Sequence, residues 1–259
     1  MRRHGGHGCG PTQYIQWVEI DAALVRKRFP AAAEYVSGIY ILARDYGRVS
    51  NSRLAAWTGV SGSAVTQVLG RLKRLGLTRH VRYESIELTE QGRLFARKVL
   101  RRHYLLEHLL VRVLDYPWEK ADDEAKRLQS EISDDLTEHL YTRLGSPQTC
   151  PHGNPMPGSA VEAKLLSAPR LSDAPPGARV RILRITEEGE QIPRMLDFCH
   201  ESGIKPGATF NVLERQGETI LLGGNRPDGR HTDGGREAPA EVKVPLEKSR
   251  HIRYETPAS

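Results

Sequence analysis

The sequence predicts an α+β chain of several domains: an N-terminal winged helix-turn-helix, a helical dimerisation domain and a C-terminal small β-barrel. Three observations predict this order. Two short helix patterns meet at a tight turn within residues 51–75, a long helical periodicity covers 90–114, and apolar residues alternate from 178 onward. At 259 residues the chain is long enough for more than one domain.

The N-terminal region precedes the first predicted domain. Residues 1–12 are rich in glycine and histidine and indicate a flexible tail, and 14–28 hold a short helix pattern. Pro30 suits the first turn of a helix, which we expect to continue to about Arg44. We therefore assign residues 1–30 to a tail with an extra helix and 31–96 to a winged helix-turn-helix.

The second helix of the 51–75 segment has the pattern of a DNA-reading helix. Gly59 can end the first helix with a positive φ, and Ser61 is a good N-cap for the second. Three apolar residues at helical spacing face inward, Val65, Leu69 and Leu72. The other side carries groups that can bind base edges and phosphates in a major groove, Ser61, Ser63, Thr66, Gln67 and Arg71.

Residues 78–88 follow as two short strands with a turn near 83–85, which predicts a wing. Residues 34–104 hold 13 Lys/Arg against 5 Asp/Glu, whereas residues 105–145 hold 5 against 10. The positive charge therefore lies on the segment that would neutralise phosphates. We expect contacts to the DNA backbone from four arginines, Arg53, Arg71, Arg79 and Arg82.

Two further helices are predicted over 90–114 and 119–144, separated by Pro117. The second carries an apolar face at spacings of three and four, formed by Leu128, Ile132, Leu136 and Leu140. This face predicts a dimer interface, and ordinary packing within the chain is the alternative. Residues 97–145 form the expected helical dimerisation domain, to which the family resemblance described below adds metal sensing.

The remainder of the chain reads as a linker and a β-rich unit. Residues 146–168 form the expected linker, and its stretch rich in proline and glycine, 145–160, is too rich in turn residues for regular structure. Residues 169–256 show four strand patterns and one helix, which predict a small, open β-barrel with a mobile loop over 224–240. The strands are expected at 178–185, 209–214, 218–223 and 241–246, and the helix at 193–202.

About residues 31–256 resemble the DtxR family of metal-dependent repressors. The resemblance rests on the reading helix and on short runs that include Leu88-Thr-Glu-Gln-Gly92, Arg102-His103 with Leu106-Glu107, and Cys150-Pro-His-Gly-Asn-Pro-Met-Pro157. It implies a homodimer that binds a palindromic operator in double-stranded DNA and represses metal-homeostasis genes when Fe²⁺ or Mn²⁺ is bound. It also implies that the C-terminal unit is SH3-like (FeoA-type), with Gly203-Ile-Lys-Pro-Gly207 as a matching turn.

The ligand positions implied by the resemblance are only partly kept. One site retains His103 and Glu107, with Asp122 where a histidine is usual, and Glu34 falls at a ligand position of the other site. The remaining ligands of that other site are replaced by Lys126, Gln129 and Ser130. Lys126 can instead pair with Glu34, so that a fixed charge substitutes for the metal. In the C-terminal unit the distal ligands would fall near 191–195, at Ile192 and Met195, which are poor ligands for these metals. Glu190 and Gln191 are adjacent and are the alternative.

Three other interpretations are weighed against a metal-responsive repressor. The lost ligands favour a metal-independent regulator of the same type, and the barrel alone could be a protein-interaction module. The change in charge sign near residue 104 favours DNA binding over the second of these. An enzyme is disfavoured because no Ser/His/Asp order and no phosphate-binding glycine loop is found. No apolar run approaches the roughly 20 residues of a membrane span, and no secretory signal is seen, so we expect a cytoplasmic protein.

Overall fold

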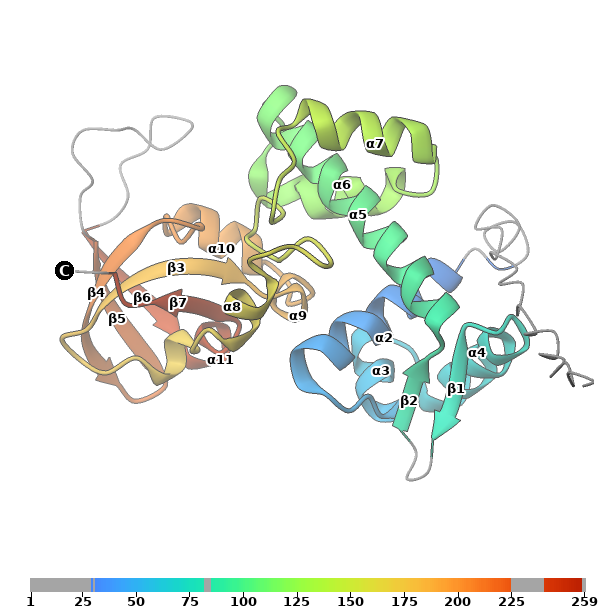
Figure 1. The fold of residues 1–259 in the computed structure, drawn as a ribbon. Coiled ribbons are helices and arrows are strands. Elements are labelled where there is room, and N and C mark those ends of the chain that lie inside the picture. Colours follow the sequence, from blue (N-terminus) through green and yellow to red (C-terminus); the bar gives the residue numbers. More distant parts are fainter. Residues whose placement is uncertain (1–28, 30, 82–84, 225–239, 258–259) are drawn as a thin grey trace, which may run out of the picture.

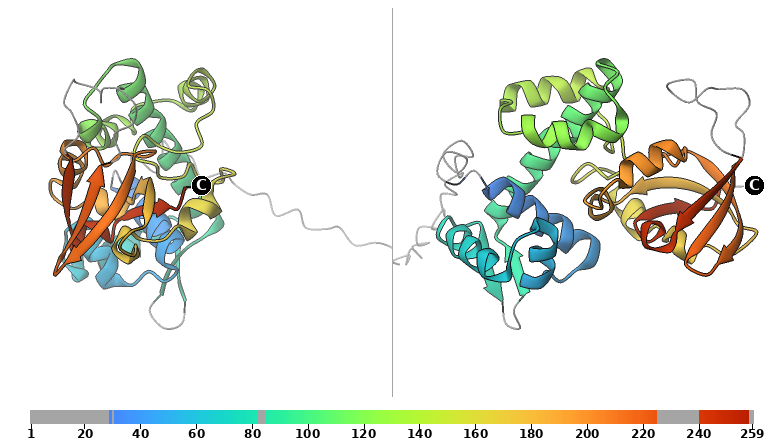
Figure 2. Two further views of the ribbon diagram at one scale, coloured as in Figure 1. Left: turned by 90° about the vertical axis from the view of Figure 1, so that its left-hand side faces the viewer. Right: turned by 180° about the vertical axis from the view of Figure 1, so that it is seen from behind.

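The structure, a computed structural model, describes residues 29, 31–81, 85–224 and 240–257. It has three parts, and the helical part lies above and between the other two (Figures 1 and 2). The predicted tail, the extra helix before residue 29, the tip of the wing and the loop over 225–239 lie outside the described residues. Among the helices described, even the longest, of 24 residues, is too rich in charge to cross a membrane.

The N-terminal part is the predicted winged helix-turn-helix. Helices α2 (Ala32–Tyr46), α3 (Asn51–Thr58) and α4 (Gly62–Arg74) precede the antiparallel strands β1 (Thr78–Val81) and β2 (Ser85–Leu88). Gly59 ends α3 with a φ of 69°, and the Ser61 side chain caps α4 by accepting from the Ala64 N–H at 3.3 Å. The inward residues Val65, Leu69 and Leu72 are buried in one core with α2. Local signals therefore sufficed to predict this part.

Helix α5 (Glu90–Val113) joins the DNA-binding part to the helical part as one continuous element (Figure 1). Phe95 and Val99 near its start are buried in the core of the winged helix-turn-helix. Leu105, further along, is buried in a separate core with Leu140 and Leu144. Any tilt of α5 thus moves both parts together.

The continuous helix predicted over 119–144 is wrong. The chain forms the short turn η1 (Trp118–Lys120), α6 (Ala121–Leu128) and, after a break, α7 (Asp134–Arg143). Ser133 caps α7 by accepting from the Leu136 N–H at 3.1 Å, and this cap competes with continuation of the helix.

The break redistributes the apolar residues that were expected to share one face. Leu128 and Leu136 are 37% and 42% exposed, as an unpaired interface would leave them. Ile132 packs against internal clusters, and Leu140 is buried within the chain. Leu140 is therefore buried by packing within the chain, which was the alternative to a dimer interface.

Residues 145–160 form no regular helix or strand, as predicted, and α8 (Glu162–Ser167) follows them within the linker. The turn before α8 is buried. Cys150, His152 and Asn154 are at most 2% exposed. Gly153 has a φ of 91°, and a Cβ there would lie 2.2 Å from the Leu183 carbonyl oxygen. Only glycine permits this turn to press so closely against the neighbouring strand.

The C-terminal part is a five-stranded antiparallel sheet with the strand order β6-β5-β4-β3-β7. Its strands are β3 (Arg179–Ile185), β4 (Thr209–Gln216), β5 (Thr219–Gly224), β6 (Glu241–Pro245) and β7 (Ile252–Glu255). Its short helical segments are η2 (Leu171–Asp173), α9 (Glu187–Glu190), α10 (Met195–Glu201) and α11 (Leu246–Ser249). The four predicted strands are present, and β7 was missed because it is a four-residue strand. The described strands do not close into a barrel, so the predicted SH3-like barrel is not confirmed.

Candidate metal centre and DNA interface

His103, Glu107 and Asp122, which were predicted as metal ligands, lie together in the structure. His103 and Glu107 are one turn apart on α5, and Asp122 comes from the first turn of α6. His103 Nε2 lies 2.8 Å from Glu107 Oε1 and 3.0 Å from Asp122 Oδ1. All three residues are buried. A first group of donor atoms is thereby assembled from two helices.

A second group shares Glu107 and draws on the turn after α7. His152 Nδ1 lies 2.9 Å from Glu107 Oε2, and Cys150 offers its sulfur within the same small space. Glu190 of α9 lies 3.6 Å from His152 Nδ1 and accepts a hydrogen bond from the Asn154 amide at 2.7 Å. We call these six side chains the metal-centre candidate: His103, Glu107, Asp122, Cys150, His152 and Glu190.

The structure does not bring the residues at the expected distal positions, Ile192 and Met195, to the metal-centre candidate. Met195 is buried in the apolar core of the sheet, and Ile192 packs against that core. Glu190 at the end of α9 faces the cluster instead. His152 was missed altogether, although Cys150-Pro-His152 lies in the segment that carried much of the family resemblance.

The imidazole and carboxyl groups of the metal-centre candidate shift one another's pKa values. Burial opposes protonation of His103, but its contacts with Asp122 and Glu107 outweigh this and raise its pKa to about 10. Burial likewise opposes protonation of His152, and Glu107 with Glu190 raises its pKa to about 9. Burial alone would raise the pKa of Glu107, yet the two imidazoles lower it to about 2.

The donor set fits a divalent metal ion. Both carboxylate oxygens of Glu107 and Nδ1 of His152 are fully buried, and none makes an aligned hydrogen bond despite their short separations. Donor atoms that lie close together but are not aligned for hydrogen bonds with one another have the arrangement expected of ligands around an ion. Imidazole and carboxylate oxygen suit Mn²⁺ and Fe²⁺, and a thiolate adds a softer donor.

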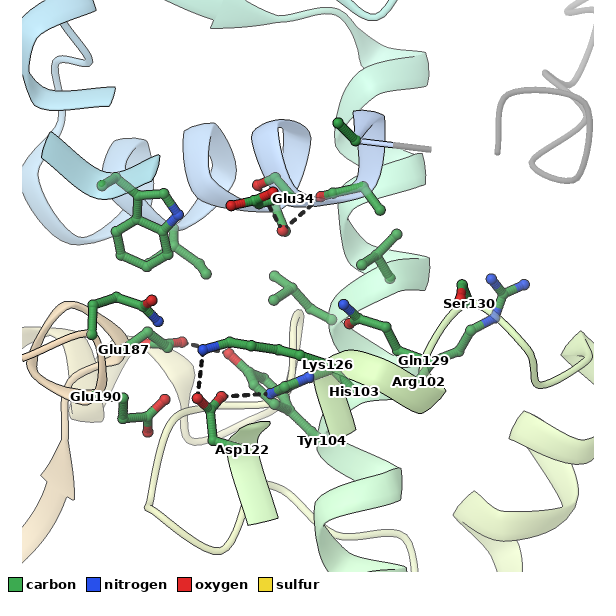
Figure 3. Close-up of a pocket in the computed structure, with 18 of the residues that line it drawn as sticks. Glu34, Arg102, His103, Tyr104, Asp122, Lys126, Gln129, Ser130, Glu187 and Glu190 are labelled. Atoms are coloured by element: carbon green, nitrogen blue, oxygen red, sulfur yellow. Dashed lines mark hydrogen bonds and ion pairs between the residues drawn. The ribbon is translucent and has the colours of Figure 1, made fainter. Parts of the chain in front are cut away.

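Lys126 does not pair with Glu34, so that hypothesis is wrong. Its ammonium nitrogen lies 2.5 Å from Asp122 Oδ2, one turn earlier on α6. Glu34 is exposed on α2 and lies across a cavity of about 790 Å³ that Lys126, Gln129 and Ser130 also line (Figure 3). Glu34 therefore does not belong to the metal-centre candidate.

The polar side of α4 is open to solvent as predicted. The exposed side chains are Ser61, Ser63, Thr66, Gln67 and Arg71. Ser61 and Ser63 hydroxyls are 3.0 Å apart, and Thr66 accepts from the Asn51 amide at 3.0 Å. These contacts fix side-chain orientation on the surface that would face DNA.

Two of the predicted backbone-contacting arginines have partners within the chain. Arg79 pairs with Glu87 across the wing at 2.9 Å. Arg53 lies 3.3 Å from Glu188 of α9 and stacks over the Tyr46 ring at 3.7 Å. Arg82 lies outside the described residues.

Comparisons with known proteins agree with this geometry. The family model described as the iron dependent repressor N-terminal DNA binding domain matches residues 29–86. The model described as the iron dependent repressor metal binding and dimerisation domain matches residues 89–158. The second match contains five of the six residues of the metal-centre candidate: His103, Glu107, Asp122, Cys150 and His152. Glu190 lies beyond it.

Relatives and solved structures cover most of the chain. The iron-dependent repressor IdeR of Mycobacterium leprae is 34% identical over 200 residues, which are 73% of this chain and 86% of that protein. The diphtheria toxin repressor of Corynebacterium jeikeium is 30% identical over 199 residues, 69% of this chain and 83% of that protein. A solved manganese-dependent transcriptional repressor in complex with manganese is 30% identical, with a TM-score of 0.70 over 87% of this chain and 99% of that one. The chain therefore belongs to the iron-dependent (DtxR) family of metal-dependent transcriptional repressors.

Proposed function

We propose that the protein is a homodimeric, metal-responsive repressor that binds a palindromic operator and takes Fe²⁺ or Mn²⁺ as its signal. The observation that carries the proposal is the buried convergence of His103, Glu107, Asp122 and His152 from separate elements. A charged cluster of this kind is costly to bury unless its members are paired or hold an ion. Glu190 and Cys150 complete the set of donors.

The cation would be held by His103, Glu107, Asp122 and His152. Its positive charge would replace that of the protons on the two imidazoles, so that imidazole and carboxylate donors can lie together in one buried centre. These residues tie α5 to α6 and to the turn that carries His152. Because α5 also packs into the core of the winged helix-turn-helix through Phe95 and Val99, its position sets where α4 stands. In a dimer, that position decides whether two α4 helices match successive half-sites of DNA.

In this proposal α4 enters the major groove. Ser63, Thr66 and Gln67 face base edges, and Ser61 contributes through its cap at the start of the helix. Arg71 and the wing arginines Arg79 and Arg82 contact phosphates, as does Arg53 once it leaves Glu188. The exposed Leu128 and Leu136 contribute to the dimer interface.

A metal-independent regulator is the second candidate, and the Lys126–Asp122 ion pair is the observation that favours it. An ammonium group fixed beside Asp122 supplies positive charge without any ion. The protein-interaction alternative has no comparable observation, and the SH3-like nature of the C-terminal sheet remains part of the proposal.

The test is fluorescence anisotropy with DNA from upstream of the protein's own coding region. Titrations in EDTA, in Mn²⁺ and in anaerobic Fe²⁺ at two salt concentrations separate the candidates. We expect tight binding with metal, loss of that response in His103→Ala, and retention of it in His139→Ala, a matched variant at an exposed histidine of α7. Equal binding in EDTA favours the metal-independent regulator, and no salt-dependent binding to DNA refutes both.

A further inference from the structure

Lys126 lies at the boundary between the metal-centre candidate and the open cavity beside α2. Its ammonium nitrogen contacts Asp122 Oδ2 at 2.5 Å, while Asp122 Oδ1 lies 3.0 Å from His103 Nε2. The Asp122 carboxylate thus has one oxygen toward the metal-centre candidate and the other toward Lys126 (Figure 3). The Lys126 side chain is 38% exposed, so it reaches Asp122 from the solvent side.

The surroundings of Lys126 are strongly acidic. The cavity of about 790 Å³ is lined by the carboxylates Glu34, Asp122, Glu131, Glu187 and Glu190. A second cavity of about 240 Å³ is lined by Glu119, Asp122, Asp123, Glu190 and Asp197. Lys126 lines both cavities, and so do Asp122 and Glu190. Lys126 therefore stands where two acid-lined spaces meet.

Other cations near this place are already engaged. Arg102 lines the larger cavity, but its guanidinium pairs with Asp134. Arg194 lines the smaller one and lies 3.7 Å from both Asp197 and Glu201. Among the lysines and arginines that the structure describes, Lys126 is thus the one in contact with a carboxylate of the metal-centre candidate.

The groups beyond Lys126 are poor metal ligands. Gln129 and Ser130 offer neutral oxygens, and the Ser130 hydroxyl donates to Glu131 at 2.7 Å. Removing the ammonium would leave Asp122 Oδ2 facing the cavity without its positively charged partner. Hard divalent cations bind such oxygen-rich places.

We propose that the Lys126 ammonium is a tethered cation that occupies the place of a second metal ion beside Asp122, so that each protomer binds one divalent ion. This inference rests on the proposed function, because it takes the metal-centre candidate as a working site. A mobile ion would have to approach within a few ångströms of a fixed like charge, which repels it. The ammonium of Lys126 is part of the chain, so the position beside Asp122 is filled at any concentration of free metal. One bound ion is therefore enough to complete the metal-centre candidate.

The test counts bound metal on the full-length protein. Mn²⁺ per protomer is measured by equilibrium dialysis, with free Mn²⁺ read from its paramagnetic resonance signal. Lys126→Glu supplies a carboxylate and should bind two ions, whereas the parent and Lys126→Arg should bind one. Lys126→Met keeps the apolar stem without the charge, and we expect at least tenfold tighter Mn²⁺ binding together with a lower melting temperature in EDTA.

Arg127→Met is the matched control, since Arg127 is the next residue on α6 and pairs on the surface with Glu124. It should leave the metal count and affinity unchanged. Two ions on the parent, or one ion on Lys126→Glu together with unchanged affinity in Lys126→Met, would overturn the inference. Metal-dependent DNA binding by the parent, assayed separately, tests the proposed function and survives either of those results.

Discussion

Arg44 of α2 donates to the Glu187 carboxylate of α9 at 2.7 Å, across the contact between the DNA-binding part and the C-terminal part. Both side chains are buried, and Glu187 also accepts from the Tyr104 hydroxyl of α5. Arg184 of β3 pairs with Asp45 of α2 at 2.9 Å beside them. The orientation of α2 is thus tied to the C-terminal sheet by a neutral, buried set of charges.

Loss of one charge from this set should destabilise the whole chain. Glu187→Gln removes a buried charge that faces both Arg44 and Arg184 and leaves Arg44 with Asp45 alone. Breaking such a pair costs about 3 kcal/mol. Glu188→Gln, at a half-buried neighbour on the same turn, should cost less than about 1 kcal/mol. Urea denaturation compares the two, and equal free energies of unfolding for both variants would contradict a buried network.

Release of Arg53 should strengthen DNA binding. Glu188 holds the Arg53 guanidinium at 3.3 Å, away from any phosphate. Glu188→Gln should therefore raise affinity for duplex DNA several-fold at low salt and steepen the salt dependence by about one phosphate contact. Anisotropy over a salt series measures this, with Glu214→Gln on exposed β4 as the control. A double variant, Glu188→Gln with Arg53→Gln, that binds as well as Glu188→Gln alone would show that the released Arg53 contacts no phosphate.

Metal-free protein should be most stable in mildly acidic solution. His103 and His152 have pKa values raised from 6.5 to about 10 and about 9, so their contribution is complete below pH 6.5 and is lost as pH rises through 9. Glu107, with a pKa lowered from 4.5 to about 2, contributes above pH 4.5 and loses this as pH falls. The melting temperature in EDTA should therefore peak between about pH 5 and 6.5.

The increase in melting temperature that Mn²⁺ produces should grow as pH rises, whereas the stability of the metal-free protein falls. Ligand imidazoles must lose their protons on binding, so the increment should grow from pH 6 to pH 8. Differential scanning calorimetry on the parent and on His152→Asn checks both trends. A pH-independent increment would mean that neither histidine is a ligand.

The leucines predicted for the interface should separate into two classes. Leu128→Ser and Leu136→Ser, at exposed positions, should weaken dimerisation in analytical ultracentrifugation and leave the monomer folded. Leu140→Ala should instead destabilise the fold by about 2–3 kcal/mol, because Leu140 packs inside the chain. Leu213→Ser on β4, also at an exposed leucine, serves as the surface control. Unchanged dimerisation in both surface variants would place the interface elsewhere.

The sequence predicts most where signals are local. The caps Ser61 and Gly59 and the inward face of α4 needed no tertiary information, and neither did the strands of the wing. The break before α7 was also visible as Ser133 followed by two aspartates, a helix start that the apolar spacing concealed. Competing local patterns, rather than missing ones, caused that error.

The candidate site was predictable only in part. His103 and Glu107 share a helix face at a spacing of four residues, and the pairing of Lys126 with Asp122 has the same spacing. His152 and Glu190 reach the cluster through an irregular turn and a four-residue helix, which carry no periodicity. Their positions depend on how the C-terminal sheet docks, and a single sequence does not specify that.

The close contact of Gly153 with β3 determines whether the N-terminal parts can be separated from the C-terminal part. The Ile185 N–H donates to the His152 carbonyl at 3.0 Å in the same place, so the turn that bears Cys150 and His152 is built against the sheet. A shortened chain that ended before β3 would expose this turn and lose Glu190. The two N-terminal parts are therefore not an autonomous sensor. A chimera with a foreign C-terminal part would have to reproduce the contact between the Gly153 turn and β3 to keep its response to metal.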